Sequence, residues 1–166
     1  MYRGRNMKTR AVLILIVLFF SITGWGTTRY RPGSEECCTR DQLVCFVKEA
    51  AAFARIYGKR EALREFKTST GLFHRGELYI YAYDFRGRVL SHGENPSLVG
   101  KNLWNLKDPN GVRIIQEMIK RLKRKGKGWL EFYWFHPISK KIMKKVGYFE
   151  RINGSWWLGS GYYVIE

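Results

Sequence analysis

The chain has 166 residues, which is enough for one domain of ordinary size. Hydrophobic residues make up 45% of it and aromatic residues 16%, a composition that excludes an intrinsically disordered protein. Its formal net charge is +16 and stays strongly positive outside the N-terminal region. Such a charge attracts anions, but it does not choose among lipid headgroups, nucleic acid and small carboxylates.

The first 26 residues have the layout of a secretory signal. Residues 1–10 carry four basic and no acidic residues, and residues 11–26 form an uncharged, mostly apolar run that ends in small residues. A membrane-spanning helix needs roughly 20 apolar residues. A cleaved signal peptide and an N-terminal membrane anchor therefore both stay open, and a buried soluble helix is the weaker third reading. In either favoured case the rest of the chain is extracytoplasmic, and is secreted or membrane-anchored.

Residues 27–39 are polar and are interpreted as a linker, and residues 40–166 are predicted to form a single domain. Its first helix is expected to have Asp41 as N-cap and to carry apolar residues at helical spacing until Gly58 ends it. A second short helix is expected over residues 60–66. Three cysteines lie around the start of this region, and a disulfide from Cys45 to Cys37 or Cys38 is expected outside the reducing cytosol.

Alternation of side chains predicts five strands, over residues 78–83, 89–90, 129–135, 142–152 and 156–164. In the first, aliphatic residues alternate with Tyr79, Tyr81 and Tyr83. Residues 93–111 are expected to be a loop, and residues 112–125 a helix with one apolar side. The predicted class is α+β: a five-stranded antiparallel sheet with an N-terminal helix and a helix inserted between strands 2 and 3, both helices lying on one side.

Residues 79–119 closely resemble single Cache domains of the second type. Their pattern is a strand, a D-x-x-G turn, a long loop and a helix, and the matching positions are Asp84, Gly87, His92, Asn95, Pro96, Gly100, Lys101, Asn102, Leu106, Asp108 and Gly111. Residues 128–152 and 156–163 fit the second half of the pattern, except that the family's Pro and Ser are missing around Lys145. The resemblance covers residues 58–163.

The resemblance implies a PAS-like sheet outside the cell and a sensor domain that binds a small molecule, often a short organic acid. Family members usually precede a membrane span and a signalling domain, whereas this sequence ends three residues after the matching stretch. The expectation is therefore a sensor that acts without its own output domain, through a membrane signalling partner.

The expected ligand is a small anion, most simply a carboxylate. Lys145, which the resemblance places in the site, would supply the cation, and His92 would lie at the rim. Aromatic side chains would form the walls: Tyr81, Tyr83, Trp134 and Tyr148. The competing interpretations are an ordinary aromatic core, a solvated Lys145 and a structural role for His92. Alternation also sets Lys145 and Tyr148 on opposite faces unless a bulge at Gly147 resets the register.

An enzyme is not expected, because the three histidines are not accompanied by a nucleophile motif or a phosphate-binding loop. Asp84 and Asp108 occupy turn contexts, and no spacing typical of a metal site is present, so neither catalytic residues, a metal nor another cofactor is predicted. Export would also keep the domain away from nucleic acid. The alternative function is a basic interaction module, in which the cation-rich run at residues 120–127 contacts an anionic membrane surface or a membrane partner.

Overall fold

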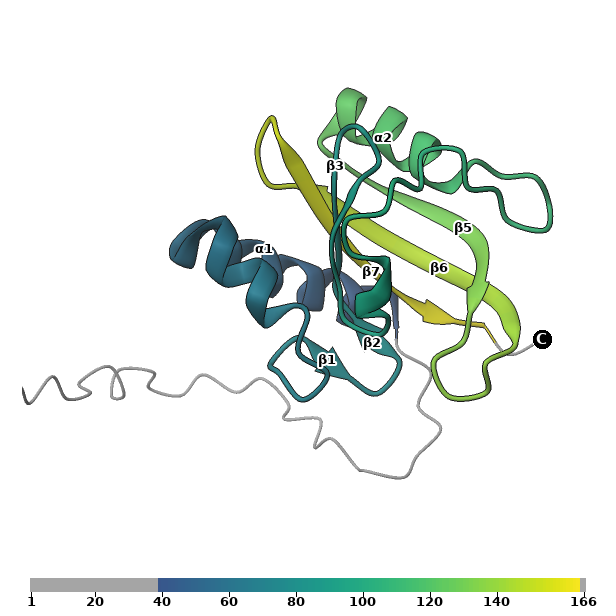
Figure 1. Ribbon diagram of the computed structural model, residues 1–166, viewed down its shortest axis with the longest axis horizontal. Helices are drawn as coiled ribbons and strands as arrows, with labels where there is room; N and C mark the ends of the chain where they lie inside the picture. The colour runs from purple at the N-terminus through teal and green to yellow at the C-terminus, as the bar shows by residue number, and fades with distance from the viewer. Residues whose placement is uncertain (1–38, 165–166) are drawn as a thin grey trace, which may run out of the picture. The chain divides into compact units, whose positions relative to one another are not determined.

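The computed structural model describes residues 39–164. Helices and strands follow one another there (Figure 1) in the order α1 (Arg40–Glu65), β1 (His74–Arg75), β2 (Leu78–Tyr79), β3 (Tyr81–Asp84), β4 (Val89–His92), the 3₁₀ helix η1 (Pro96–Leu98), α2 (Ile114–Lys125), β5 (Lys127–Phe135), β6 (Ile142–Arg151) and β7 (Trp156–Tyr163).

Strands β3 to β7 form one antiparallel sheet in the order β4-β3-β7-β6-β5. Helix α1 precedes this sheet, and α2 lies in the chain between its second and third strands. The predicted α+β class, with a five-stranded antiparallel sheet and an inserted helix, is therefore confirmed. Because β3 and β7 occupy the middle of the sheet, the strands from the two ends of the domain are hydrogen-bonded neighbours.

Helix α1 begins with a capping box. The Thr39 hydroxyl accepts a hydrogen bond from the Gln42 backbone N–H (3.2 Å), and the Gln42 side chain accepts one from the Thr39 N–H (2.7 Å). The prediction that Asp41 is the N-cap is therefore wrong, because Asp41 lies inside the first turn, where its charge suits the helix dipole. The predicted break at Gly58 is confirmed, since its φ of +80° is not helical.

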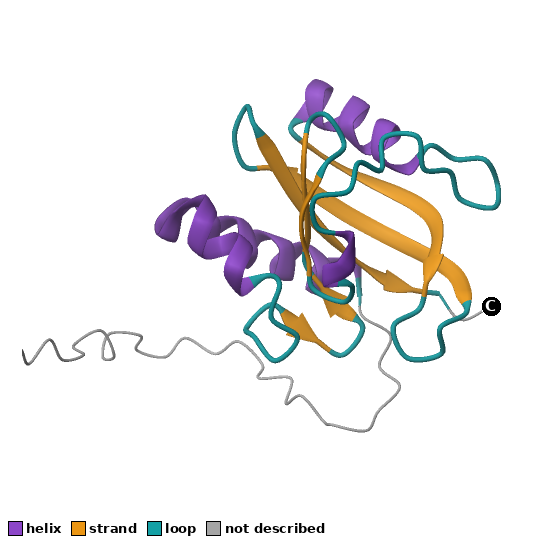
Figure 2. Ribbon diagram, viewed as in Figure 1, coloured by secondary structure: helices purple, strands orange, loops and turns teal. Residues whose placement is uncertain are grey.

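The two long helices pack on opposite faces of the sheet, with the strands between them (Figure 2). Trp156 and Leu158 of β7 belong to the core beneath α1, whereas Trp157 of the same strand packs with Phe149 in the core beneath α2. The prediction that both helices cover one side is wrong. Since β7 is apolar on both faces, its sequence does not tell which face each helix covers.

The strand predicted over residues 78–83 is divided at Ile80. Residues Leu78–Tyr79 pair with β1 in a separate two-stranded sheet that was not predicted, and Tyr81–Asp84 join the large sheet. The alternation nevertheless continues through the break: Ile80 faces α1, and Tyr79 and Tyr81 both face α2.

Two aspartates shape the turns around the site, as their sequence contexts predicted. Oδ1 of Asp84 accepts hydrogen bonds from two backbone N–H groups of the β3–β4 turn. Oδ1 of Asp108 does the same in the loop before α2, and its Oδ2 accepts a third bond from the Tyr133 N–H of β5 (3.1 Å). Asp108 thereby fastens the loop over residues 93–111 to the edge strand of the sheet.

Some predictions fall outside the described residues. These are the signal peptide or anchor at residues 1–26, nearly all of the linker, and the cysteines Cys37 and Cys38; Cys45 lies exposed on α1. Between residues 39 and 164, none of the helices combines the length and the hydropathy that crossing a bilayer requires.

Candidate ligand pocket

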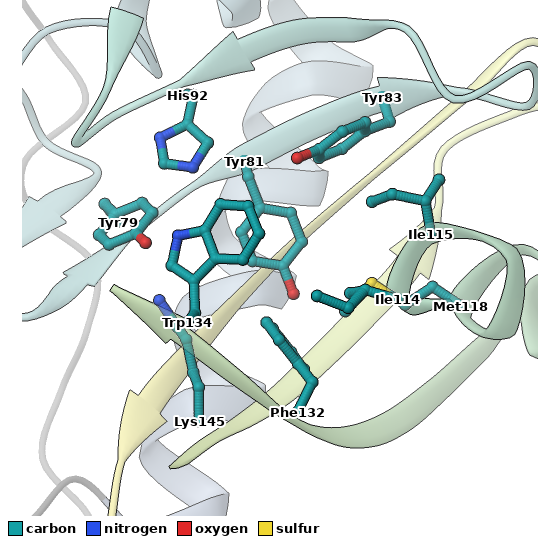
Figure 3. A pocket seen from close by; sticks show the side chains of 10 residues that line it. All are labelled: Tyr79, Tyr81, Tyr83, His92, Ile114, Ile115, Met118, Phe132, Trp134 and Lys145. Atoms are coloured by element: carbon teal, nitrogen blue, oxygen red, sulfur yellow. The ribbon is translucent and has the colours of Figure 1, made fainter. Parts of the chain in front are cut away.

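A small cavity of about 20 Å³ lies between the large sheet and α2 (Figure 3). A cavity measured in this way holds a water molecule from roughly 10–15 Å³, so there is room for about one or two groups of that size. Aromatic and aliphatic side chains form most of its wall, with one imidazole and one ammonium group: Tyr79, Tyr81, Tyr83, His92, Ile114, Ile115, Met118, Phe132, Trp134 and Lys145.

Three tyrosines at alternate positions cover the sheet side of the cavity. Tyr79, Tyr81 and Tyr83 are all buried, and the Tyr81 hydroxyl donates a hydrogen bond to the Ser160 carbonyl on the neighbouring β7 (3.3 Å). Burial raises the pKa of each phenol above its ordinary value. All three hydroxyls therefore stay protonated at neutral pH, and this wall carries no negative charge.

Lys145 is the charged group of the cavity. Its side chain is 1% exposed, and its Nζ lies 4.0 Å from the centre of the Tyr79 ring and 4.5 Å from that of Tyr163. Nζ donates a hydrogen bond to the Tyr163 hydroxyl (3.3 Å), which itself donates to the Phe135 carbonyl (2.6 Å). Neutral partners and ring faces therefore surround the ammonium group.

No carboxylate among residues 39–164 lies within ion-pair distance, 4.0 Å, of Lys145. The carboxylates of Glu77 and Glu94 act on Lys145 electrostatically from a longer distance. Glu77 pairs with His136 (3.5 Å), and Glu94 pairs with Lys140 (2.9 Å). Burial lowers the pKa of Lys145 to about 7, against the raising effect of these two carboxylates. A buried ammonium without an anion beside it is costly, and an anion that enters the cavity would relieve that cost.

His92 supplies a neutral donor. Its ring is 2% exposed, and its Nδ1 accepts a hydrogen bond from the Asn95 backbone N–H (3.0 Å). Burial, together with the charge of Lys145, lowers the pKa of His92 to about 3, so the ring is neutral at physiological pH. Because Nδ1 accepts, the single ring proton is assigned to Nε2, which leaves one N–H group for a ligand.

Five of the six predicted site residues line this cavity: Tyr81, Tyr83, His92, Trp134 and Lys145. Tyr148 does not. It packs in the core beneath α1, and its hydroxyl donates to Glu150 (2.6 Å). The β5–β6 pairing runs through Gly147 without a register shift, so Lys145 and Tyr148, three positions apart, face opposite sides. The prediction of Tyr148 as a pocket wall is wrong for this reason.

Sequence reasoning missed several residues of the site. Tyr79 was predicted to share the face of Tyr81 and Tyr83 but was left out of the predicted site. Phe132 lies two positions before Trp134, so the period of two could have placed both in the site. Tyr163 had no readable signal, because its position opposite Lys145 depends on the pairing register of β6 and β7. The residues from α2 were predicted to be apolar, but not to face the site: Ile114, Ile115 and Met118.

The arrangement suits binding of a small anion, with one buried cation, one neutral N–H donor and otherwise apolar walls. Between residues 39 and 164, no group of three or more His, Cys, Asp or Glu side chains is placed to hold a metal ion.

A family model described as a Cache domain matches residues 56–166. The chain belongs to the Cache domain family. The match includes the sheet, the loop over residues 93–111 and α2, and it confirms the resemblance seen in the sequence to a single Cache domain of the second type.

Two relatives of this Cache domain are signalling proteins. The methyl-accepting chemotaxis protein McpP of Pseudomonas putida is 26% identical over 89 residues, and the sensor histidine kinase MctS of Rhizobium johnstonii is 28% identical over 166 residues. The alignments cover 53% and 99% of this chain, but 16% and 31% of the relatives. The chain thus spans less than a third of either protein.

Solved structures show the same fold in chemosensory domains. A methyl-accepting chemotaxis protein of Vibrio parahaemolyticus superposes with a TM-score of 0.66 at 31% identity, over 75% of this chain and 87% of that one. A periplasmic sensor domain of a chemotaxis protein gives 0.61 at 26%, over 75% and 90%. A Cache chemosensory domain that recognises carboxylic acids gives 0.59 at 27%, over 75% and 88%. The protein is therefore a Cache sensor domain of the kind found in chemoreceptors and sensor kinases.

Proposed function

We propose that this Cache domain is an extracytoplasmic sensor that binds a short organic carboxylate between its sheet and α2. The observation that carries the proposal is the buried Lys145, which has no carboxylate within ion-pair distance among residues 39–164. A ligand carboxylate would supply the missing anion, and the His92 N–H would donate a second hydrogen bond. The similar chemosensory domain that recognises carboxylic acids supports the same class of ligand.

The cavity restricts the length and the polarity of that ligand. Its volume of about 20 Å³ leaves little space beyond the carboxylate, which favours the shortest monocarboxylic acids. The far wall consists of apolar groups such as Ile114 and Met118. A second carboxylate or an amino group there would be buried without a partner, so dicarboxylates and amino acids should bind poorly.

The proposed role is binding followed by signalling, without catalysis. The relatives are a chemotaxis receptor and a sensor kinase, and one structural neighbour is a periplasmic sensor domain. The basic–apolar order of residues 1–26 supports an extracytoplasmic location, reached by secretion or by a membrane anchor. A membrane signalling partner would then receive the signal.

A thermal-shift series tests the ligand class. Acetate, propionate and butyrate are compared with their neutral amides, which have nearly the same shape but no charge. We expect at least one acid to raise the melting temperature in a concentration-dependent way, since a ligand that binds only the folded state stabilises it. The amides should have no such effect.

Two lysine variants localise the response. Lys145→Met should abolish the shift, and Lys144→Met is the matched control because it removes the same charge from the neighbouring position, which faces the other side and pairs with Glu131. If acids and amides stabilise equally, or if Lys145→Met responds as the unaltered chain does, the proposed carboxylate site is wrong.

A further inference from the structure

A second concave feature lies at the opposite end of β5 from the pocket. It is a groove of about 500 Å³ between the first half of α1 and the last turn of α2, where β5 begins at the edge of the sheet. Trp129 and Tyr148 provide aromatic side chains in it, and five cations line it: Lys48, Arg121, Arg124, Lys125 and Lys127. We call this feature the basic groove.

The cations of the basic groove come from three elements: Lys48 from α1, three residues from α2, and Lys127 from β5. Within residues 39–164, only Arg121 among them has a carboxylate within ion-pair distance, Glu117 at 3.7 Å. Glu150 of β6 lies opposite Lys127 in the strand pairing and accepts the hydrogen bond of Tyr148. No acidic side chain lines the groove, so Glu117 and Glu150 compensate its five cations only in part, and the like charges repel one another.

Some cations elsewhere on the domain have a carboxylate partner: Arg75 pairs with Glu49 (3.1 Å), and Lys140 pairs with Glu94 (2.9 Å). Many exposed cations of residues 39–164 do not, so the groove is distinguished by the number of cations that meet in one place. The dipole of α2 explains a preference for cations in its last turn. It does not explain Lys48, which belongs to another helix, nor Lys127, which lies beyond the C-cap Gly126. The concentration of charge therefore needs a further reason.

Arg121 shows that part of this charge is already desolvated. Its Nη1 is buried and has no hydrogen-bond partner among the described residues. The side chain lies against Gly128, where an added Cβ would come within 3.1 Å of the Arg121 Cβ and 3.0 Å of the Phe149 ring. The glycine thus lets the helix pack closely onto the strand, while the Arg121 side chain, which is 35% exposed, still lines the groove.

We propose that the basic groove is a second ligand site, for a small phosphate-containing anion with two or more negative charges. Phosphate oxygens match the forked donors of Arg121 and Arg124, and a multivalent anion neutralises cations on both walls at once. The groove is concave, and both α1 and α2 supply cations to its lining. This shape favours a compact anion over the flat surface of a bilayer. The site is separate from the carboxylate pocket, because the two share no lining residue.

The test is calorimetry of pyrophosphate binding to the full 166-residue chain in a non-ionic detergent. The groove variant is Lys48→Gln combined with Arg124→Gln, two exposed positions on opposite walls. The matched control is Lys120→Gln combined with Lys123→Gln, which removes the same charge from exposed positions of α2 that do not line the groove. We expect the groove variant to lose about tenfold or more in affinity, and the control to lose about twofold or less.

Three outcomes would overturn the proposal. Equal losses in the two double variants would show that net charge alone attracts the anion. No binding of pyrophosphate by the unaltered chain would exclude the site directly, and binding to phosphatidylglycerol vesicles in its place would assign the groove to a lipid surface. Lys145→Met, which disables the carboxylate pocket, should leave pyrophosphate affinity unchanged, so a failure of one site does not imply a failure of the other.

Discussion

At the scale of single residues, the carboxylate proposal depends on the protonation of Lys145. Its ammonium group is buried among Tyr79, Tyr163 and His92, and burial lowers its pKa to about 7. The pKa of His92 is lowered to about 3, and burial raises the pKa of both phenols. None of these three neighbours therefore changes its charge near neutral pH, and Lys145 is the group in the cavity that does.

Carboxylate affinity should fall as pH rises through this range. The anion needs the charged form of Lys145, which is mostly present at pH 6 and mostly lost at pH 8, so we expect affinity to drop about tenfold between these values. Binding should also take up protons at pH 7.5, which calorimetry in two buffers of different ionisation enthalpy measures. Lys145→Met should bind weakly without this pH dependence, and a pH-independent affinity of the unaltered chain would contradict the account.

The unliganded protein should show the opposite dependence in its stability. The ordinary pKa of 10.5 applies to Lys145 in the unfolded chain, so between about pH 7 and 10 the unfolded state binds more protons than the folded one. The free energy of unfolding then gains a contribution from Lys145 that grows as pH rises through this window. Urea titrations should show that the free energy of unfolding of Lys145→Met, minus that of the unaltered chain, decreases as pH rises through this window. A constant difference would show that Lys145 does not have the lowered pKa.

The position of Tyr148 gives a prediction for a residue outside the pocket. Tyr148→Phe removes the hydrogen bond to Glu150, which should cost about 0.5–1.5 kcal/mol of unfolding free energy. It should leave carboxylate affinity within about twofold, because Tyr148 faces α1. Trp134→Ala removes a pocket wall and should weaken binding clearly. If calorimetry finds that Tyr148→Phe and Trp134→Ala weaken carboxylate binding equally, Tyr148 belongs to the site and this account of it is wrong.

At the scale of elements, the loop before α2 connects the pocket to the edge of the sheet. Asp108 is 7% exposed and accepts three backbone hydrogen bonds, two within its own loop and one from Tyr133 of β5. The loop leads directly into α2, which supplies Ile114, Ile115 and Met118 to the cavity. Asp108 is thus a positioning residue for that wall.

Asp108→Ala should lower the unfolding free energy by about 2–4 kcal/mol, since it leaves buried N–H groups without partners. It should also weaken carboxylate binding by displacing α2. The control is Asp41→Ala, which removes an exposed carboxylate from the first turn of α1 and should cost less than about 1 kcal/mol. Urea denaturation compares the two, and equal small losses would mean that the loop does not depend on Asp108.

The alternation of side chains along a strand predicted which face of the sheet several residues occupy. It placed the tyrosines of residues 79–83 on one face correctly, even though the strand is broken at Ile80. It also required Lys145 and Tyr148 to face opposite sides. The family pattern placed Lys145 in the pocket, and Tyr148 was expected there as an aromatic residue of a later strand. The structure follows the alternation because no bulge forms at Gly147.

At the scale of the whole domain, properties that depend on long-range pairing were not readable from the sequence. Strand order places β7 between β3 and β6, which brings Tyr163 opposite Lys145. The opposite placement of the two helices was missed for a related reason, since adjacent tryptophans of β7, Trp156 and Trp157, are both buried. A strand that is apolar on both faces carries no periodic signal for either face.

The most direct test of the central claim is a crystal structure of the protein with the acid that stabilises it most. The account predicts the carboxylate in the cavity between the sheet and α2, within about 3 Å of Lys145 Nζ and in hydrogen-bonding contact with His92. An acid bound elsewhere, or a cavity without ligand in which Nζ still contacts only Tyr163 at saturating acid, would contradict it.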